Sequence, residues 1–425
     1  MEQLSKPLSA FRILFIGLVA AIVVVGTAFI VLVISHAGAQ VDLQQVDVLA
    51  NSTDDCVTCH REDTPGIVEQ FSHSVMASAK VTCRNCHEVT KEYPAAVEHE
   101  GAYILAAPTT AMCQKCHEVE VAQFYQSRHS LPAYVAVAGS KDLNPTLLAM
   151  YQAVPEGSFT LDKSRNAIAV LEGSTIMPFT CENCHSVGQP AADESVGRCQ
   201  KCHIRHEFSL AQARKPETCN NCHIGPDHPQ WEIYQESPHG IQYATLGSNW
   251  NWEAPTGTLS VADFPAPTCA ICHMSGFGAA STTHDVGDRL SWFLFASMST
   301  QRPNWEANRS QMQSVCRECH NEKFVTNLFY TADDATQQVN AWVQASNDLV
   351  EPLQKQNLIN TGDYNEPIDF TYYDLWHFYG RTTKFGAWMQ GADYSQWHGA
   401  YPLQETMATL REMVDAKLQA VGATP

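Results

Sequence analysis

Sixteen cysteines dominate the chemistry available to this sequence, and every one of them lies in a Cys-x-x-Cys-His motif. Two thiols at this spacing can add to the two vinyl groups of one haem, and the histidine that follows becomes an axial ligand of its iron. The sequence therefore predicts eight covalently attached haems c, on the motifs Cys56/Cys59/His60, Cys83/Cys86/His87, Cys113/Cys116/His117, Cys181/Cys184/His185, Cys199/Cys202/His203, Cys219/Cys222/His223, Cys269/Cys272/His273 and Cys316/Cys319/His320.

Two other uses of paired cysteines fit this pattern less well. Exported proteins often join cysteines in disulfides, and zinc ribbons also use Cys-x-x-Cys pairs. Neither use requires a histidine after every second cysteine. Haem attachment requires it at each motif, and here no motif lacks it.

Ten histidines lie outside the motifs and are candidates for the second axial position on the irons. An iron that only transfers electrons usually takes a second axial ligand, whereas an iron that binds substrate keeps that position open. His36 lies beside an apolar N-terminal segment and is set aside. The remaining histidines permit eight bis-His haems, and they equally permit seven bis-His haems and one open haem.

Local sequence selects among these histidines. His73, His129 and His239 occur in the similar settings Gln-Phe-Ser-His-Ser, Gln-Ser-Arg-His-Ser and Glu-Ser-Pro-His-Gly, which indicates one shared role as distal ligands. His206 follows His203 by three residues and can reach a neighbouring haem. The full set of predicted distal ligands is His73, His99, His129, His206, His239, His284 and His377.

Asp227 and His228 form a different kind of candidate. They follow the sixth motif in the segment Cys-His-Ile-Gly-Pro-Asp-His-Pro-Gln. A carboxylate beside an imidazole can accept and pass on protons. Near an open haem iron, this pair would take protons from a bound substrate.

The elements that position these motifs must be short. One haem serves about 33 residues between Cys56 and His320, so the segments between motifs cannot bury a sizeable core of side chains alone. The haems are expected to form the core of a mainly α multihaem cytochrome c fold with little sheet. Residues 56–320 are the predicted octahaem domain, and the irregular motif spacing argues against a solenoid.

Residues 13–34 form an apolar run without charge that is long enough to span a bilayer as a helix. Lys6 and Arg12 precede this run, so residues 1–12 are a predicted cytoplasmic stub and the chain from the connector 35–55 onward lies on the periplasmic side of the inner membrane. Ala37-Gly38-Ala39 resembles a signal-peptide cleavage site, which leaves a soluble periplasmic protein as the alternative. Both interpretations place the haems outside the cytoplasm.

Residues 321–425 contain no cysteine and are predicted to form a C-terminal helical bundle. Thr331 begins a plausible helix start, Thr-Ala-Asp-Asp. A later helix is predicted from an apolar stripe at helical spacing, with Gly422 as its stop, and the stripe consists of Leu403, Met407, Leu410, Val414, Leu418 and Val421. Between the third and fourth motifs, residues 161–170 read as an irregular or strand-like insert.

The formal net charge of −19 limits the class of partner. Haem propionates would make the surface still more acidic, which argues against nucleic acid as a ligand. The charge favours electrostatic steering of a basic redox partner, and it is equally compatible with a role in solubility alone.

The number and grouping of the motifs resemble the octahaem hydroxylamine oxidoreductase family, which includes hydrazine dehydrogenases and reductive members. The resemblance covers residues 56–320 and is most specific at residues 219–228, where the family carries an Asp-His pair just after its sixth motif. A C-terminal signature of the family also matches, in Trp376-His377, Gly380-Arg381, Gly391-Ala-Asp-Tyr394 and Gln396-Trp-His-Gly-Ala-Tyr401.

This resemblance implies roles for individual residues. The fourth haem, on Cys181, Cys184 and His185, would be open and catalytic, and Asp227 and His228 would move protons over it. The other seven haems would be bis-His electron carriers. The resemblance also implies a homotrimer in which, for the oxidative members, a tyrosine of the neighbouring subunit is joined covalently to the catalytic haem. Candidates for that tyrosine are Tyr394 and Tyr401, whereas helix packing is the expected role of Tyr372, Tyr373 and Tyr379.

The leading expectation is an enzyme that oxidises hydroxylamine to nitric oxide or nitrite. Hydrazine oxidation, reduction of nitrite or hydroxylamine, and a membrane-anchored electron conduit without its own substrate are the alternatives. The anchor and a comparatively short C-terminal part depart from the oxidative family members. They point to a redox partner that is a cytochrome or a quinone-linked membrane protein.

Overall fold

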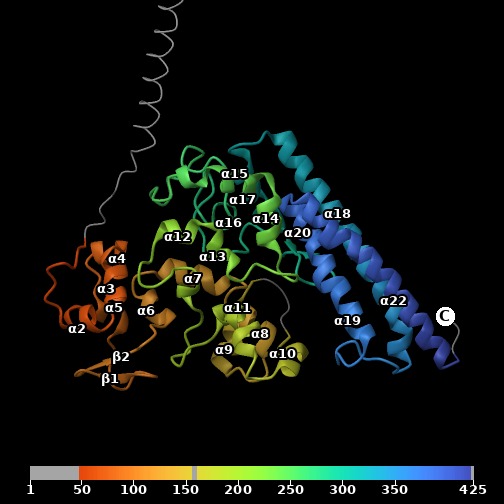
Figure 1. The fold of residues 1–425 in the computed structure, drawn as a ribbon, viewed down its shortest axis with the longest axis horizontal. Helices are drawn as coiled ribbons and strands as arrows, with labels where there is room; N and C mark the ends of the chain where they lie inside the picture. The colour runs from red at the N-terminus through yellow and green to blue at the C-terminus, as the bar shows by residue number, and fades with distance from the viewer. Residues whose placement is uncertain (1–46, 156–159, 423–425) are drawn as a thin grey trace, which may run out of the picture.

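The computed structural model describes residues 47–155 and 160–422, and this part of the chain is mainly helical (Figure 1). Its strands form two small antiparallel pairs, β1 (Val97–His99) with β2 (Ala102–Ile104) and β3 (Trp292–Phe293) with β4 (Thr300–Gln301). The prediction of a mainly α fold with little sheet is confirmed.

The eight motifs occupy short helices and turns. Three of the motif helices, α5 (Cys83–His87), α11 (Cys181–His185) and α16 (Cys269–His273), run from the first cysteine of a motif to its histidine. Residues four apart lie on one face of a helix, so the first cysteine and the histidine point to the same side. The Thr268 side chain caps α16 by accepting a hydrogen bond from the backbone of Ile271.

Other short helices connect the motifs. From the first motif to the fourth these are α2 (Asp55–Asp63), α3 (Pro65–Ser72), α4 (Val75–Ser78), α6 (Thr110–Gln114), α7 (Glu118–Gln126), α8 (Leu131–Ala138), α9 (Pro145–Ala153) and α10 (Ala167–Glu172). Around and after the fourth motif they are η1 (Met177–Phe179), η2 (Ser186–Gly188), η3 (Cys199–Lys201), α12 (Leu210–Arg214), α13 (Pro216–Asn220), α14 (Gln230–Glu236), α15 (Pro238–Leu246), η4 (Gly247–Asn249) and α17 (Trp305–Arg317).

The C-terminal region contains the long helices drawn in blue and teal in Figure 1. Helix α18 packs on both α20 and α22 there, and short π-helical turns interrupt the path from α19 to α22. The elements are α18 (Glu322–Lys355), α19 (Pro367–Asp374), η5 (Leu375–Gly380), α20 (Arg381–Met389), α21 (Ala392–Ser395), η6 (Gln396–Ala400) and α22 (Tyr401–Ala420).

Two predictions for this region have different outcomes. The stripe on α22 is confirmed as a buried face from Leu403 to Leu418, whereas Val421 is exposed just after the helix and precedes Gly422 at a φ of 73°. The predicted start at Thr331 is wrong. Helix α18 already begins after Asn321, whose side chain accepts from the backbone N–H of Phe324, and the Thr331 hydroxyl bonds within the helix to the carbonyl of Asn327.

The location of the apolar core also differs from the prediction. Motif helices α5 and α11 contain no buried residue, which fits segments that wrap around a large cofactor, but two apolar clusters lie between motifs, around Phe264 and around Val135. The C-terminal helices, however, bury a core of their own, formed by Val339, Val343, Val350, Leu353, Ile359, Ile368, Leu375, Leu403, Met407, Leu410, Val414 and Leu418. A long chain segment free of motifs can therefore build an apolar core from side chains alone.

The insert after the third motif is irregular only up to Asn166. The side chain of Asn166 accepts from the backbone of Ile168 and Ala169, and this cap starts helix α10. The strand-like interpretation of residues 161–170 is therefore wrong. The predicted anchor, residues 13–34, lies outside the described residues, and no described helix is both long and apolar enough to cross a membrane.

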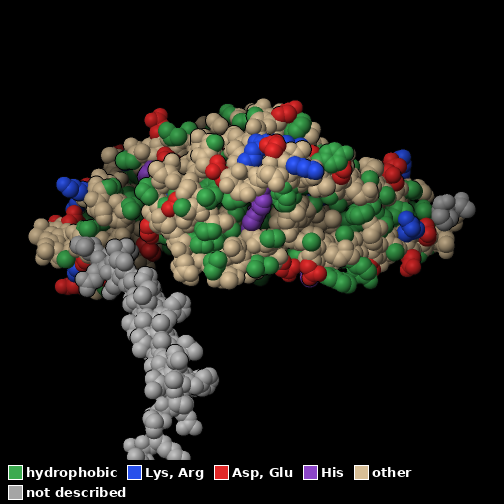
Figure 2. Space-filling view, turned by 90° about the horizontal axis from the view of Figure 1, so that it is seen from above, with side chains coloured by type: hydrophobic (Ala, Val, Ile, Leu, Met, Phe, Trp, Pro, Cys, Tyr) green, Lys and Arg blue, Asp and Glu red, His purple; other side chains and the backbone are tan. Residues whose placement is uncertain are grey.

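Charged side chains are spread over the surface. On the face in Figure 2, Asp and Glu side chains and Lys and Arg side chains are interspersed rather than collected into one patch. This face gives a docking partner no single acidic area, so steering would rest on the overall charge of −19.

Candidate functional site

Five motif histidines face a second histidine across a constant gap. The ring centres are 5.9 to 6.4 Å apart in the pairs His60–His99, His87–His206, His223–His129, His203–His284 and His320–His239. A metal–imidazole bond is about 2 Å long, so two imidazoles on opposite sides of one iron have ring centres about 6 Å apart. The five pairs therefore have the spacing that bis-His haems require.

Hydrogen bonds fix the orientation of several motif histidines. Nδ1 of His87 lies 2.7 Å from the carbonyl oxygen of Leu105, and Nδ1 of His185 lies 2.6 Å from that of Ala133. Nδ1 of His60 contacts the Thr64 hydroxyl at 2.7 Å. A bond at Nδ1 leaves Nε2 free to bind iron and sets the direction of the ring.

Buried donors without partners also match a haem. Nη2 of Arg214, Nε of Arg289 and Nε1 of Trp250 are buried and have no hydrogen-bond partner among the described residues. Such donors are rare because an unsatisfied buried N–H is costly. Haem propionates are anionic acceptors of the kind that these donors lack.

The two alternatives to haem attachment, disulfides and a zinc site, find no support in the described structure. All sixteen cysteines are free thiols. The described residues contain no group of three or more His, Cys, Asp or Glu that could hold a metal ion. The cysteine pairs, the oriented imidazoles and the unsatisfied donors together fit c-type haems at these motifs.

The histidine of the fourth motif, His185, has different neighbours from the five paired motif histidines. The ring centre of His228 lies 6.3 Å from that of His185, but the two planes are nearly perpendicular, at 78°. His228 also lies 6.2 Å from His223 of the sixth motif. The loop between α13 and α14 thus places His228 between the fourth and sixth motifs.

Asp227 is held by two histidines. Its Oδ2 lies 2.7 Å from Nδ1 of His228 and 3.4 Å from Nε2 of His377, which comes from the π-helical turn η5. Burial alone would raise the pKa of the Asp227 carboxyl, but the hydrogen bonds from His228 and His377 hold it well below its usual range. Asp227 is therefore ionised at neutral pH.

His377 is part of this cluster. Tyr373 Oη and Arg381 Nη1 each lie 2.9 Å from its Nε2. Burial lowers the pKa of His377 to about 4, against the opposing effect of Asp227. Nδ1 of His377 is buried and has no hydrogen-bond partner among the described residues.

Arg381 and Phe295 close the cluster. The Arg381 side chain is buried and donates from Nε to the carbonyl oxygen of Phe295 at 2.8 Å. Burial lowers its pKa to about 10, so it remains charged at neutral pH. The Phe295 ring covers His228 at 5.0 Å.

The outcome for each predicted residue can now be stated. The structure brings Asp227 and His228 together beside His185, and it pairs His99, His129, His206, His239 and His284 with motif histidines. His377 is corrected, because it contacts Asp227 and Arg381 instead of facing a motif histidine. No ring pair within the described residues involves His73, whose Nε2 lies 3.2 Å from Glu69, or the motif histidines His117 and His273.

Two members of the cluster were missed as site residues. Tyr373 was assigned to helix packing, and Arg381 was noticed only within the C-terminal signature. Their spacing from His377, four residues on either side, is the signal that could have found them, since residues four apart share a helix face.

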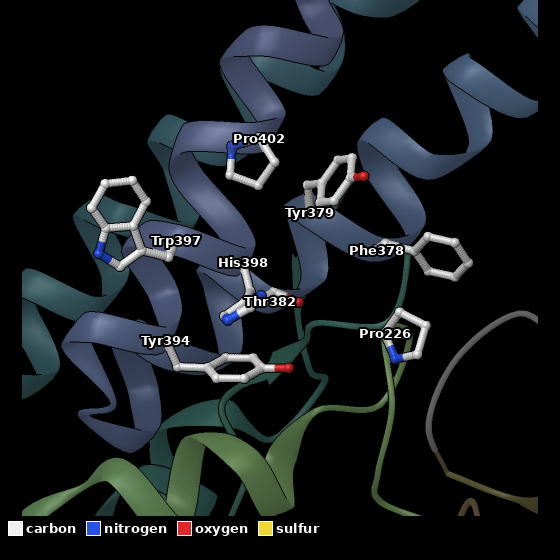
Figure 3. A pocket seen from close by; sticks show the side chains of 8 residues that line it. All are labelled: Pro226, Phe378, Tyr379, Thr382, Tyr394, Trp397, His398 and Pro402. Atoms are coloured by element: carbon white, nitrogen blue, oxygen red, sulfur yellow. The ribbon is translucent and has the colours of Figure 1, made fainter.

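The tyrosines Tyr394 and Tyr401 lie away from the cluster. Tyr394 stacks on His398 with ring centres 4.3 Å apart, and both line a cavity of about 280 Å³ with Pro226 and Phe378 (Figure 3). Tyr401 is 53% exposed and contacts Trp397. The cavity adjoins the cluster through Pro226 and Phe378, which are the sequence neighbours of Asp227 and His377.

Contacts between thiols of different motifs show which motifs are neighbours. A neighbouring thiol shifts the pKa of Cys113, Cys184 and Cys219, and these neighbours are Cys199, Cys222 and Cys269 respectively. Sγ of Cys184 also lies 3.8 Å from the carbonyl oxygen of Asn221 in the sixth motif. Electrostatic interactions link four more pairs, Cys56–Cys83, Cys86–Cys116, Cys202–Cys219 and Cys272–Cys316. The motifs therefore form the chain 1–2–3–5–6–7–8, and the fourth motif joins it at the sixth.

Comparison with known proteins agrees with these findings. The profile of a family described as seven times multi-haem cytochrome CxxCH matches residues 79–367. Over 246 residues the chain is 31% identical to a probable nitrite reductase-hydroxylamine oxidoreductase fusion protein of Kuenenia stuttgartiensis, a match that covers 52% of this chain and 25% of that protein. The chain thus spans about a quarter of the length of this relative.

Two solved structures share the fold. A hypothetical multiheme protein is similar with a TM-score of 0.73 and 22% identity, over 87% of this chain and 96% of that one. A chain of the reducing HAO-like protein complex of Kuenenia stuttgartiensis is similar with a TM-score of 0.64 and 20% identity, over 89% of this chain and 87% of that one.

Proposed function

This chain belongs to the multihaem cytochromes with repeated Cys-x-x-Cys-His motifs. We propose that it is an oxidoreductase of small inorganic nitrogen compounds and that its substrate reacts at the fourth motif. The observation that carries the proposal is the Asp227–His228 pair beside His185. At this motif the second histidine is nearly perpendicular to the motif histidine, at 78°, and is held by a carboxylate, whereas the ring planes of the five other pairs are 26 to 51° apart.

The leading reaction is the oxidation of hydroxylamine to nitric oxide or nitrite. A haem bound by Cys181, Cys184 and His185 would supply the iron at which the substrate is oxidised. Oxidation of hydroxylamine releases protons as well as electrons. His228 takes such a proton, and the ionised Asp227 stabilises the imidazolium that forms and fixes its orientation. Phe295 covers His228 and limits access of water.

The remaining motifs would carry the electrons away. We propose eight haems in all, of which those at the five motifs with a facing histidine are bis-His. Electrons from the fourth motif would pass first to the sixth, because Sγ of Cys184 lies 3.8 Å from the carbonyl oxygen of Asn221 within the sixth motif. The sixth motif then offers two routes, through the fifth or through the seventh.

Reduction of nitrite or hydroxylamine is the second candidate, and Arg381 favours it. A buried guanidinium beside His377 provides positive charge for an anionic substrate such as nitrite. One solved relative of this fold belongs to a reducing complex, and His377 and Tyr373 would then serve as proton donors.

The assembly and location follow as further parts of the proposal. We propose a homotrimer, held on the periplasmic side of the inner membrane by residues 13–34 or released there by cleavage, with a cytochrome or a quinone-linked membrane protein as redox partner. For hydroxylamine oxidation, Tyr394 or Tyr401 of a neighbouring subunit would be joined to the fourth haem.

Electron paramagnetic resonance of the oxidised holoprotein, with and without cyanide, tests the open centre. We expect a high-spin signal from about one haem in eight that cyanide converts to low spin. A fully low-spin spectrum that cyanide leaves unchanged would instead indicate an electron conduit without its own substrate.

A further inference from the structure

Arg289 is a buried cation beside the seventh motif. Its side chain is 1% exposed and is the largest of the fully buried side chains among the described residues. It lies in the segment between the seventh and eighth motifs, far in sequence from the Asp227 cluster. Nothing in the proposed reaction uses it.

The guanidinium holds the backbone of the seventh motif directly. Nη1 donates to the carbonyl oxygens of Ile271 at 3.0 Å and Cys272 at 2.9 Å, the two residues that precede His273. Nη2 donates to the carbonyl oxygens of Ser275 at 2.8 Å and Ser281 at 2.6 Å. The positive charge is therefore fixed within one or two residues of an axial ligand.

This charge has no carboxylate partner in the described structure. The acidic neighbour Asp288 interacts with Arg289 only through its charge, and its Oδ1 accepts from Nε2 of Gln311 instead. Nε of Arg289 is buried without a partner. Within the described chain, four carbonyl oxygens compensate the charge, and Nε is left for an acceptor outside the chain such as a haem propionate.

The arginines within two other motifs are exposed and paired. Arg317 of the eighth motif forms an ion pair with Glu322 and is 36% exposed, and Arg84 of the second motif pairs with Glu88 while 43% exposed. Water and the partner carboxylate screen both charges. Neither arginine acts at the short range and low dielectric of Arg289, and the buried Arg214 donates to the carbonyl oxygens of Trp252 and Ala254, which lie outside the motifs.

We propose that Arg289 raises the reduction potential of the haem at the seventh motif and makes it the first haem of the array to be reduced. Oxidation of a haem iron adds one positive charge, and a buried cation nearby disfavours that charge strongly because the local dielectric is low. Reduction of this haem takes one electron from an external donor, and no bond is made or broken.

The contacts between motifs indicate where a raised reduction potential at the seventh haem would direct electrons. Helix α13, which carries Cys219 of the sixth motif, packs on α16 of the seventh motif. A seventh haem of high potential would draw electrons at the branch point toward the eighth motif rather than toward the fifth. This role concerns the haems of the family fold and does not depend on which nitrogen compound reacts.

A potentiometric titration of the holoprotein, followed by visible absorbance, tests the proposal. In the wild type we expect one component of about one eighth of the haem absorbance to reduce first. Arg289→Gln should move that component to lower potential, and Arg289→Lys, which keeps the charge, should leave it near its wild-type position. Arg317→Gln is the control, because its charge is already paired and exposed.

A second variant tests the proposal if Arg289→Gln fails to bind its haems. Asp288→Asn removes the nearest negative charge and retains the acceptor for Gln311, so the first component should move to higher potential. The proposal is overturned if haem-loaded Arg289→Gln titrates like the wild type, or if Asp288→Asn does.

Discussion

Oδ2 of Asp227 lies 2.7 Å from Nδ1 of His228, the next residue in the chain. Neighbouring side chains usually point apart, and here the loop before Pro229 turns both toward the fourth motif. His377 approaches the same carboxylate oxygen at 3.4 Å from a segment 150 residues away. The carboxylate thus joins the motif region to the C-terminal helices.

Removal of the Asp227 charge should abolish most turnover. We expect Asp227→Asn to lower kcat about 100-fold or more, because general acid–base groups contribute roughly 10²- to 10⁴-fold. His228→Ala should have a similar effect. Steady-state assays with hydroxylamine as donor and nitrite as acceptor measure both.

Haem counting by mass spectrometry and pyridine haemochrome must show eight haems in these variants. Asp348→Asn, on the exposed side of α18, serves as the carboxylate-to-amide control and should retain wild-type turnover. Normal turnover in Asp227→Asn would refute the assignment of this pair as proton acceptors.

Arg381 should discriminate substrates by charge. Arg381→Gln should raise KM for nitrite roughly 10- to 100-fold, since a hydrogen bond to a charged group contributes about 1.5–3 kcal/mol. The KM for neutral hydroxylamine should change much less, and Arg381→Lys should restore part of the nitrite affinity. Equal effects on the two substrates would mean that Arg381 only positions His377.

The sixth motif should control the exit of electrons from the fourth. His129 pairs with His223 of that motif, so His129→Ala should slow electron transfer out of the site in stopped-flow measurements while the first reduction at the site persists. His99→Ala removes the partner of His60 at the other end of the chain of motifs and should leave this step unchanged. Identical kinetics in the two variants would contradict the branch at the sixth motif.

Lys384 should make stability depend on pH. Burial lowers its pKa to about 7, with a smaller effect of Arg381, whereas an unfolded lysine has a pKa of about 10.4. Between these values the unfolded state binds more protons, so the free energy of unfolding rises as the pH increases from about 7 to about 10. Below about pH 7 both states are protonated and this contribution is constant.

Lys384→Met should flatten this rise and stabilise the protein most at neutral pH. Guanidinium denaturation followed by circular dichroism, at about pH 7 and about pH 10, measures the change. Lys355→Met, at an exposed lysine on α18 paired with Glu351, should keep the wild-type slope. A wild-type slope in Lys384→Met would show that Lys384 stays protonated in the folded state.

The sequence by itself determined the haem motifs and much of the helical pattern, because both depend on residues close together in the chain. A Cys-x-x-Cys-His motif completes its attachment site within five residues, and the apolar stripe on α22 follows from helical periodicity. The Asp227–His228 pair was also visible for this reason. The start of α18 was missed because Asn321, a single capping residue directly after His320, gave a weaker signal than the later Thr331.

Only the tertiary structure decided which histidine faces which motif, since the partners of His87 and His223 are separated from them by about a hundred residues. It also moved His377 from the predicted iron ligands to the Asp227 cluster and added Arg381 and Tyr373 to it. The cost of burying charge selects such arrangements, because an ionised carboxylate and a guanidinium are tolerated in the interior only where folding brings hydrogen-bond partners to them. No local sequence pattern predicts those hydrogen-bond partners.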